Sequence, residues 1–447
     1  MKKGIGLAAL LLATMARASF TDDERRDVAR FWNEPGRYAS ESSRWQARLT
    51  PEGSQWLWNL NKLRNPGKTA PNTTPSTGHA AWDEWLASKY EADRLVAEAE
   101  VSRLNGQPPI LPPSAFSDPE PFDLNAAAGP APVFVAAVQP KIYHVRFDEG
   151  EYQYTDQVNV RQKYAYFRFA QGVMAGGRPV KSLPSEELDA LLADSGVDAT
   201  QGRVMRAVSM LEGGFESVNT YDTGFLSVGF IQFAALMQGG GSLGAVMLRL
   251  KSDEPTAFQN DFRRYGIDVS DAGLIQVADE SGDLEGASAV ARIIDDKRLT
   301  AVFQRAGERC RAFRIAQIRT AMSSFYPSND PVTLVCSRGT LAGKVSDFIK
   351  SEAGLATLMD RKVNTGNIAA LAAAAKAVAE QVGATCLSDL VPYERDIVAK
   401  LRYRKDYLSD TTLAQPAGGV TLASTPPLTS RSGSGRGNRN HNRKSRS

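Results

Sequence analysis

The residues best suited to catalysis fall in one window, Val208–Met237, which contains Glu212, Asp222, Ser227 and Gln232. Apolar residues recur at helical spacing before Glu212, so this glutamate is expected in the last turn of an amphipathic helix that Gly213-Gly214 ends. Asp222 then lies in a run of turn-forming residues, ten positions after Glu212. This order predicts two carboxyl groups on opposite sides of a cleft.

Such a pair of carboxyl groups is suited to cleaving a glycosidic bond. The leaving oxygen must be protonated, and apolar surroundings such as Leu211 and Phe215 would raise the pKa of Glu212 enough for it to act as general acid. Asp222 would stabilise the oxocarbenium-like transition state or position water. Ser227 and Gln232 are candidates for holding that water or a substrate acetamido group. Glu216 is the nearest rival for the acid.

A plainer interpretation is that Glu212 is a solvated helix end and that Asp222-Thr223-Gly224 is an ordinary turn. The joint order and spacing favour a site over this interpretation.

This window resembles the catalytic core of the lysozyme-like superfamily, which includes phage-type lysozymes, lytic transglycosylases and chitosanases. Phage-type lysozymes have a helix-end Glu, an Asp about nine residues later and a Thr fifteen residues later. Here Asp222 and Ser227 follow Glu212 by ten and fifteen residues. The Ser-x-Gly-x-x-Gln run that ends at Gln232 is closer to the transglycosylases, so the match mixes two branches. It is close over about thirty residues only.

The resemblance implies a mainly α, α+β fold with a small β-hairpin. It also implies action on peptidoglycan or a related amino-sugar polymer, by hydrolysis or lytic transglycosylation. Glu212, Asp222 and Ser227 are its expected catalytic residues, and Gln232, Tyr221 and Tyr326 are expected to bind substrate. No metal or organic cofactor is implied. A non-catalytic wall-binding or structural protein with this fold is the alternative, and chitosanase-like action on an unacetylated polymer is a third hypothesis.

Composition narrows the chemistry further. The chain has 447 residues, 42% of them hydrophobic, and only three histidines, His79, His144 and His441. Histidines so scattered make a zinc site or a Ser-His-Asp triad an unfavourable interpretation. One disulfide with one thiol left over is expected among Cys310, Cys336 and Cys386, with the pairing open.

The first residues predict export. Lys2 and Lys3 precede the apolar run Ile5–Ala16, and Ala16-Arg17-Ala18 has the small-x-small form of a cleavage site. We therefore expect a secreted, periplasmic or cell-envelope protein without a membrane span. The oligomeric state is open.

Charge separates the two ends of the chain from the folded part. Six positive charges and no negative ones follow Asp410, and the first 18 residues carry three more positive charges, so residues 19–410 carry net −6 out of the total +3. The basic tail is expected either to contact an anionic polymer or to act as a solubilising segment.

The organisation expected from these patterns has six parts. They are a signal peptide (1–18), a helical module with all six tryptophans (19–106), a Pro-rich linker or strap (107–132), a small β-rich segment (133–180), the lysozyme-like domain (181–408) and a disordered basic tail (409–447). For the module we favour tryptophans packed as core over an aromatic stripe for sugar rings.

Local patterns also predict individual elements. The helices are 80–104, 186–193, 201–212, 243–251, 299–324, 341–358 and 368–382, and the strands are 133–138, 142–147 and 164–169.

Overall fold

The structure, a computed structural model, describes residues 20–66, 79–111, 114–162, 164–210 and 213–418. It confirms a mixed fold of helices and small antiparallel sheets. The predicted signal peptide and Glu212 lie outside the described residues, as does the tail from residue 419. No helix in the described part of the chain is long and apolar enough to cross a membrane.

The larger body begins with α1, which Thr21 caps through a reciprocal capping box with Glu24. Trp32 at the end of α1 is buried in the main core and donates from its indole nitrogen to the Tyr265 carbonyl at 3.1 Å. The helices of this body are α1 (Asp22–Trp32), η2 (Val180–Ser182), α5 (Ser185–Asp194), α6 (Ala199–Ser209), α7 (Gly241–Asp253), α8 (Pro255–Asp261), η3 (Arg263–Tyr265), α9 (Ala287–Asp295), α10 (Lys297–Arg309) and α11 (Arg311–Phe325).

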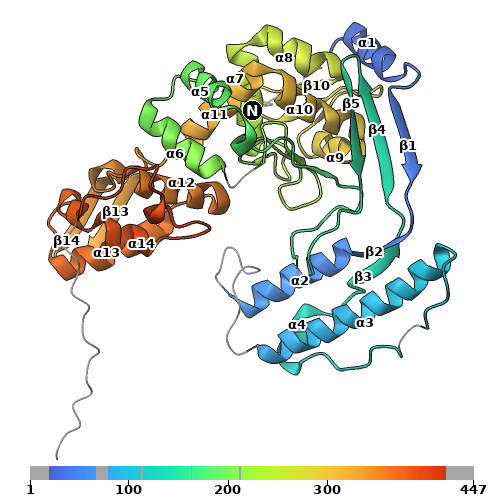
Figure 1. The fold of residues 1–447 in the computed structure, drawn as a ribbon, viewed down its shortest axis with the longest axis horizontal. Coiled ribbons are helices and arrows are strands. Elements are labelled where there is room, and N and C mark those ends of the chain that lie inside the picture. Colours follow the sequence, from blue (N-terminus) through green and yellow to red (C-terminus); the bar gives the residue numbers. More distant parts are fainter. Residues whose placement is uncertain (1–19, 67–78, 112–113, 163, 211–212, 419–447) are drawn as a thin grey trace, which may run out of the picture.

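Three small sheets accompany these helices (Figure 1). The first contains β1 (Tyr38–Ser42), β4 (Lys141–Phe147) and β5 (Gly150–Thr155), in the order β1-β4-β5, with Ser42 paired to Lys141. The second contains β6 (Met174–Ala175), β7 (Val218–Asn219), β8 (Ser227–Val228) and β9 (Phe233–Ala234) in sequence order. The third contains β10 (Ile267–Val269), β11 (Ile275–Val277) and β12 (Leu284–Glu285).

A smaller core gathers the tryptophan-rich elements. It packs around β2 (Gln46–Leu49), α2 (Pro51–Arg64), α3 (Ala80–Leu104), α4 (Phe122–Ala128) and β3 (Val135–Val138), and β2 pairs with β3. Trp56, Trp82 and Trp85 are buried here, as predicted for core indoles, whereas Trp58 is half-buried. The segment 19–106 therefore contributes two strands as well as helices, and its first helix packs on the other core.

The Pro-rich segment lies over this smaller core as a strap. The indole nitrogens of Trp82 and Trp85 donate to Asp123 Oδ1 at 2.7 Å and to the Asp118 carbonyl at 3.0 Å. Trp56 donates in the same way to the Gly129 carbonyl at 3.2 Å. These bonds satisfy buried indole N–H groups, so the tryptophans fix the strap as well as the core.

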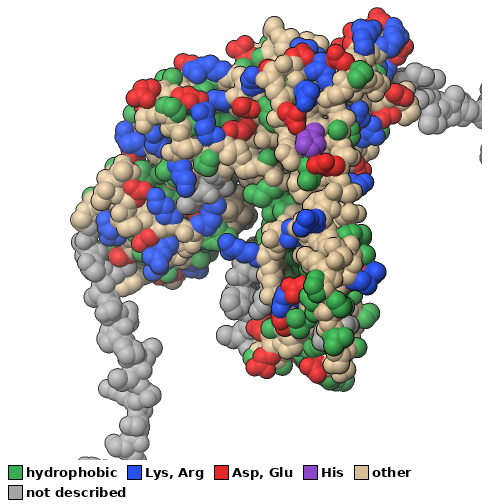
Figure 2. Space-filling model, turned by 45° about the vertical axis from the view of Figure 1, so that its right-hand side comes forward, with side chains coloured by type: hydrophobic (Ala, Val, Ile, Leu, Met, Phe, Trp, Pro, Cys, Tyr) green, Lys and Arg blue, Asp and Glu red, His purple; other side chains and the backbone are tan. Residues whose placement is uncertain are grey.

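The C-terminal lobe continues the main core. Its elements are β13 (Pro331–Cys336), β14 (Gly339–Lys344), η4 (Val345–Asp347), α12 (Glu352–Thr365), α13 (Ala369–Val382), η5 (Leu387–Tyr393), α14 (Glu394–Ala399) and η6 (Tyr407–Ser409). In Figure 1 this lobe and the tryptophan-rich elements extend separately from the larger body, and Figure 2 shows an open notch between them.

Several sequence predictions were wrong. Residues 341–344 form a strand instead of a helix, residues 164–169 form no strand, and Cys310 breaks the helix expected over 299–324. The segment after Thr411 was expected to be disordered, but Leu413 is buried and the Ala353 N–H donates to the Ala414 carbonyl at 3.1 Å. Cys310, Cys336 and Cys386 are all free thiols, so the expected disulfide is absent from this described part of the chain.

Candidate active site

The helix that leads into the candidate site is α6. Asp198 caps it through a capping box with Gln201, and Val204, Met205 and Val208 bury one face of it in the main core. The helix ends at Ser209, three residues before Glu212, and the described chain resumes at Gly213. Of the four candidate residues in this window, Asp222, Ser227 and Gln232 lie within the described residues.

The small sheet β6-β7-β8-β9 positions these residues. Asn219 on β7 pairs with Ser227 on β8, and Ser227 pairs in turn with Ala234 on β9. The loop 220–226 between β7 and β8 carries Asp222. The turn expected around Asp222 leads into β8, and a second short strand, β9, follows it.

Asp222 is held by two hydrogen bonds inside its own loop. Its Oδ2 accepts from Asn219 Nδ2 at 2.7 Å, and its Oδ1 accepts from the Gly224 N–H at 2.9 Å. Burial raises the pKa of Asp222 above the ordinary 3.8, although these two hydrogen bonds and the positive charge of Arg168 act in the opposite direction. The carboxyl group is thus oriented firmly and protonates more readily than a surface aspartate.

Ser227 lies beside the same glycine. A Cβ atom placed on Gly224 would be 2.3 Å from Ser227 Oγ and 3.2 Å from Asp222 Oδ1. Any side chain at position 224 would collide with the serine hydroxyl, so the glycine allows both groups to approach. The structure therefore places Asp222 and Ser227 on two sides of the same glycine.

Gln232 lies in the turn between β8 and β9. It adopts a positive φ of 56°, and its Nε2 donates to Ser217 Oγ at 2.7 Å and to the Gly229 carbonyl at 3.1 Å. The same Ser217 hydroxyl oxygen is 2.7 Å from where a Cβ atom on Gly213 would lie. Gln232 thus connects, through Ser217, to the residue that follows Glu212.

Glu216, the rival acid, is engaged by a neighbouring loop. Its Oε1 accepts from the Arg178 N–H at 2.6 Å, and its side chain lies where a Cβ on Gly177 would be. This carboxylate therefore accepts a hydrogen bond from the backbone of Arg178 and packs against Gly177, which gives it a structural role.

Two supporting residues were missed by sequence analysis. The buried Gln317 on α11 donates from Nε2 to the Phe215 carbonyl at 3.0 Å and accepts at Oε1 from the Phe230 N–H at 3.3 Å. The backbone N–H of Arg168 donates to the Tyr221 carbonyl at 2.7 Å, and its guanidinium acts on the charge of Asp222. Both lie 50 or more residues from the groups that they support, so local spacing carried no signal for them.

Tyr221 and Tyr326 were both expected to contact substrate. Tyr221 is buried in the smaller core, where its ring lies 6.1 Å from the rings of Tyr164 and Phe167. Tyr326 follows α11, and burial together with the charges of Asp198 and Glu352 raises its pKa to about 12. Asp198 caps the start of α6, whereas the site follows the end of that helix, so Tyr326 is not brought to Asp222.

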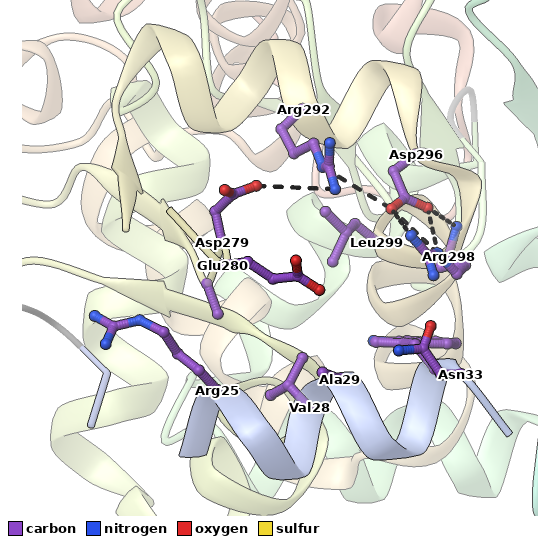
Figure 3. Close-up of a pocket in the computed structure, with 12 residues that line it drawn as sticks. Arg25, Val28, Ala29, Asn33, Asp279, Glu280, Arg292, Asp296, Arg298 and Leu299 are labelled. Atoms are coloured by element: carbon purple, nitrogen blue, oxygen red, sulfur yellow. Dashed lines mark hydrogen bonds and ion pairs between the residues drawn. The ribbon is translucent and has the colours of Figure 1, made fainter. Parts of the chain in front are cut away.

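A separate cavity of about 290 Å³ lies between α1 and the start of α10 (Figure 3). Arg292 reaches between Asp279 and Asp296, at 3.9 and 4.0 Å, while Asp296 also pairs with Arg298 at 2.7 Å. Asp222, Ser227 and Gln232 do not line this cavity. Its charges are largely paired with one another, and it is not part of the site described above.

No protein-family model matches the chain, and no curated protein or solved structure is significantly similar to it. Within the described residues, no group of three or more His, Cys, Asp or Glu side chains is arranged to hold a metal ion. The function must therefore be argued from the site itself.

Proposed function

We propose that this protein is an exported enzyme that cleaves glycosidic bonds in peptidoglycan or a related amino-sugar polymer. Glu212 serves as general acid, and Asp222 stabilises the positive charge that develops on the sugar or positions the attacking group. Ser227 and Gln232 hold water or the substrate acetamido group. The reaction is hydrolysis or lytic transglycosylation within a lysozyme-like domain.

The observation that carries this proposal is the arrangement of Asp222 and Ser227 around Gly224, in the loop and strand that follow α6. Asp222 is half-buried and its pKa is raised, as is common for carboxyl groups at catalytic sites. The order Glu, Asp, Ser, Gln in the sequence also supports a glycan-cleaving site.

A second hypothesis has its own supporting observation. Both oxygens of Asp222 accept hydrogen bonds from their own loop, and Tyr221 is buried. A loop stabilised in this way would persist in a wall-binding or structural protein that no longer catalyses.

The deciding experiment incubates the wild-type protein and Glu212→Gln with purified peptidoglycan and weighs the released fragments by mass spectrometry. Fragments from the wild type alone are expected, and their masses distinguish reducing-end from anhydro products. Sedimentation with the polymer without fragments from either protein would favour the binding hypothesis. Equal release by both proteins would exclude Glu212 as the acid.

A further inference from the structure

Four aromatic rings form a continuous row from the surface of α2 to the candidate site. The Trp58 ring centre lies 5.3 Å from that of Tyr166, Tyr166 lies 5.4 Å from Tyr164, and Tyr164 lies 6.1 Å from Tyr221. We call these four residues the aromatic row. Tyr221 directly precedes Asp222, so the row ends at the candidate site.

The row is a surface feature along most of its length. In residues 164–168 the side chains alternate, because Ala165 and Phe167 are buried in the smaller core while Tyr164, Tyr166 and Arg168 remain half-buried. Trp58 is also half-buried, unlike the neighbouring Trp56. The alternation leaves Tyr164 and Tyr166 half-buried, and Trp58 and Tyr164 pack against the edge of the smaller core without entering it.

The row is attached rigidly to both parts of the molecule. Ser54 Oγ on α2 donates to the Tyr164 carbonyl at 2.8 Å, and Arg168 Nη1 donates to Ser54 Oγ at 3.3 Å. At the other end the Arg168 and Phe169 N–H groups donate to the Tyr221 carbonyl at 2.7 and 3.3 Å. The phenols of Tyr164 and Tyr221 share a hydrogen bond. The position of the rings relative to Asp222 is therefore fixed by backbone contacts.

Polar groups flank the rings. Lys62 Nζ lies over the Trp58 ring at 5.3 Å from its centre, and the Arg168 guanidinium carbon lies at 5.8 Å. Sugar rings present an apolar face of C–H groups and a rim of hydroxyl and carbonyl oxygens. A row of aromatic rings with cationic N–H donors over one of its members matches both parts of such a ligand.

We infer that the aromatic row is a glycan-binding surface that carries an amino-sugar strand from α2 to Asp222. The inference rests on the proposed function and adds to it, because it assigns substrate binding to a surface formed by α2 and residues 164–166. Tyr166 and Trp58 contact successive sugar units, while Lys62 and the Arg168 N–H groups that are not bonded to Ser54 and the Phe167 carbonyl donate to their oxygens.

Single-stranded nucleic acid also binds to aromatic rings with neighbouring cations. The row ends at the carboxyl group of Asp222, and that negative charge would repel a phosphate backbone. The glycan is therefore the favoured occupant, and the nucleic acid is an outcome that the test must exclude.

The test measures binding of the hexamer of N-acetylglucosamine by calorimetry, with full-length protein carrying Glu212→Gln so that the ligand stays intact. Trp58→Ala and Tyr166→Ala are each expected to weaken binding about tenfold. Trp58→Phe keeps an aromatic face and should recover part of the loss. Trp45→Ala is the matched control, because Trp45 is also half-buried but is attached to Asn105 through its backbone.

The outcomes separate the two proposals. A loss in the Trp58 and Tyr166 variants, with Trp45→Ala unchanged and melting temperatures preserved, supports the aromatic row even if the wild type releases no fragments from peptidoglycan. Unchanged affinity for the hexamer in a folded Tyr166→Ala protein, or in a folded protein that combines Trp58→Phe with Tyr166→Ala, overturns the aromatic row. Cleavage of peptidoglycan by the wild type would then support the proposed function without it. Binding of a single-stranded oligonucleotide but not the hexamer also overturns it.

Discussion

Asp222 Oδ2 accepts a 2.7 Å hydrogen bond from the side-chain amide of Asn219, three residues earlier in the same loop. Because Asn219 lies on β7 and is paired with Ser227 on β8, this bond ties the carboxylate to the hairpin that also carries the serine. The orientation of Asp222 thus depends on the small sheet and not on the loop alone.

Asp222→Asn is expected to lower cleavage on the order of 10²-fold, as for loss of a positioned carboxylate. Burial raises the pKa of Asp222 above 3.8, so activity that requires its ionised form should fall on the acid side at a higher pH than for an ordinary aspartate. The measurement is a pH–rate profile of released fragments. Asp271→Asn is the control, because it changes an exposed aspartate in the β10–β11 turn and should leave the profile unaltered. Cleavage by Asp222→Asn at the wild-type rate would contradict the catalytic role of Asp222.

The same raised pKa predicts how stability varies with pH. A carboxyl group whose pKa is higher in the folded than in the unfolded protein binds its proton more tightly when folded. Its stabilising contribution is therefore present below the unfolded pKa near 3.8 and is lost as the pH rises through the raised value. Denaturant unfolding of Asp222→Asn at several pH values should lack this dependence.

Gly307→Ala should disrupt the chain beside the site. A Cβ atom there would lie 2.3 Å from the Phe215 carbonyl oxygen and 2.4 Å from Glu216 Cα, and both are backbone atoms. We expect a loss of about 1–3 kcal/mol in the free energy of unfolding, with reduced cleavage, because α10 must move away from residues 215–216.

Gly202→Ala is the matched control, because Gly202 lies within α6 and its added Cβ would meet only Leu192 Cδ1 at 3.5 Å. Alanine in a helix should stabilise this variant by about 0.5–1 kcal/mol. Equal stability of the two variants, measured by chemical denaturation, would mean that the close approach at Gly307 is unimportant.

The C-terminal boundary of the fold can be tested by truncation. Ending the chain after Asp410 removes the buried Leu413 and the hydrogen bond of 2.9 Å from the Ala414 N–H to Glu352 Oε2. We expect a loss of about 3 kcal/mol from these contacts. Truncation after Gly418 keeps both contacts and should unfold at the same denaturant concentration as the full chain; equal loss in both proteins would place the boundary elsewhere.

Long periodic segments were the most predictable parts of the fold. The helix predicted over 80–104 has those bounds, because an uninterrupted run of helix-forming residues without Gly or Pro, followed by Gly106, is a local property of the sequence. The segment 341–344 was assigned to a helix on the same criteria but pairs with β13, since a tertiary contact overrides a weak local preference. At Cys310 an extended backbone ends α10 and starts α11 without a glycine or proline to announce it.

In the candidate site too, the features set by local sequence were predictable and those set by tertiary contacts were not. Asp222 and Ser227 are five residues apart, so the turn that carries Asp222 toward the strand of Ser227 could be predicted from turn chemistry. The buried face of Tyr221 and the support from Arg168 and Gln317 depend on segments far away in sequence, and no single-sequence pattern relates them.

The pairing of Ser42 with Lys141 has an architectural consequence. The chain leaves the larger body at Ser42 and re-enters it at Lys141, on the adjacent strand, so the tryptophan-rich elements form an insertion whose entry and exit points are neighbours. A short hairpin turn could join these two strands without altering the path of β1 or β4. Ala165, Phe167 and Tyr221, which follow the insertion in the chain, complete its core. The inserted unit is therefore joined to the larger body by shared packing as well as by two neighbouring strands, and the reach of the site toward a polymer depends on both.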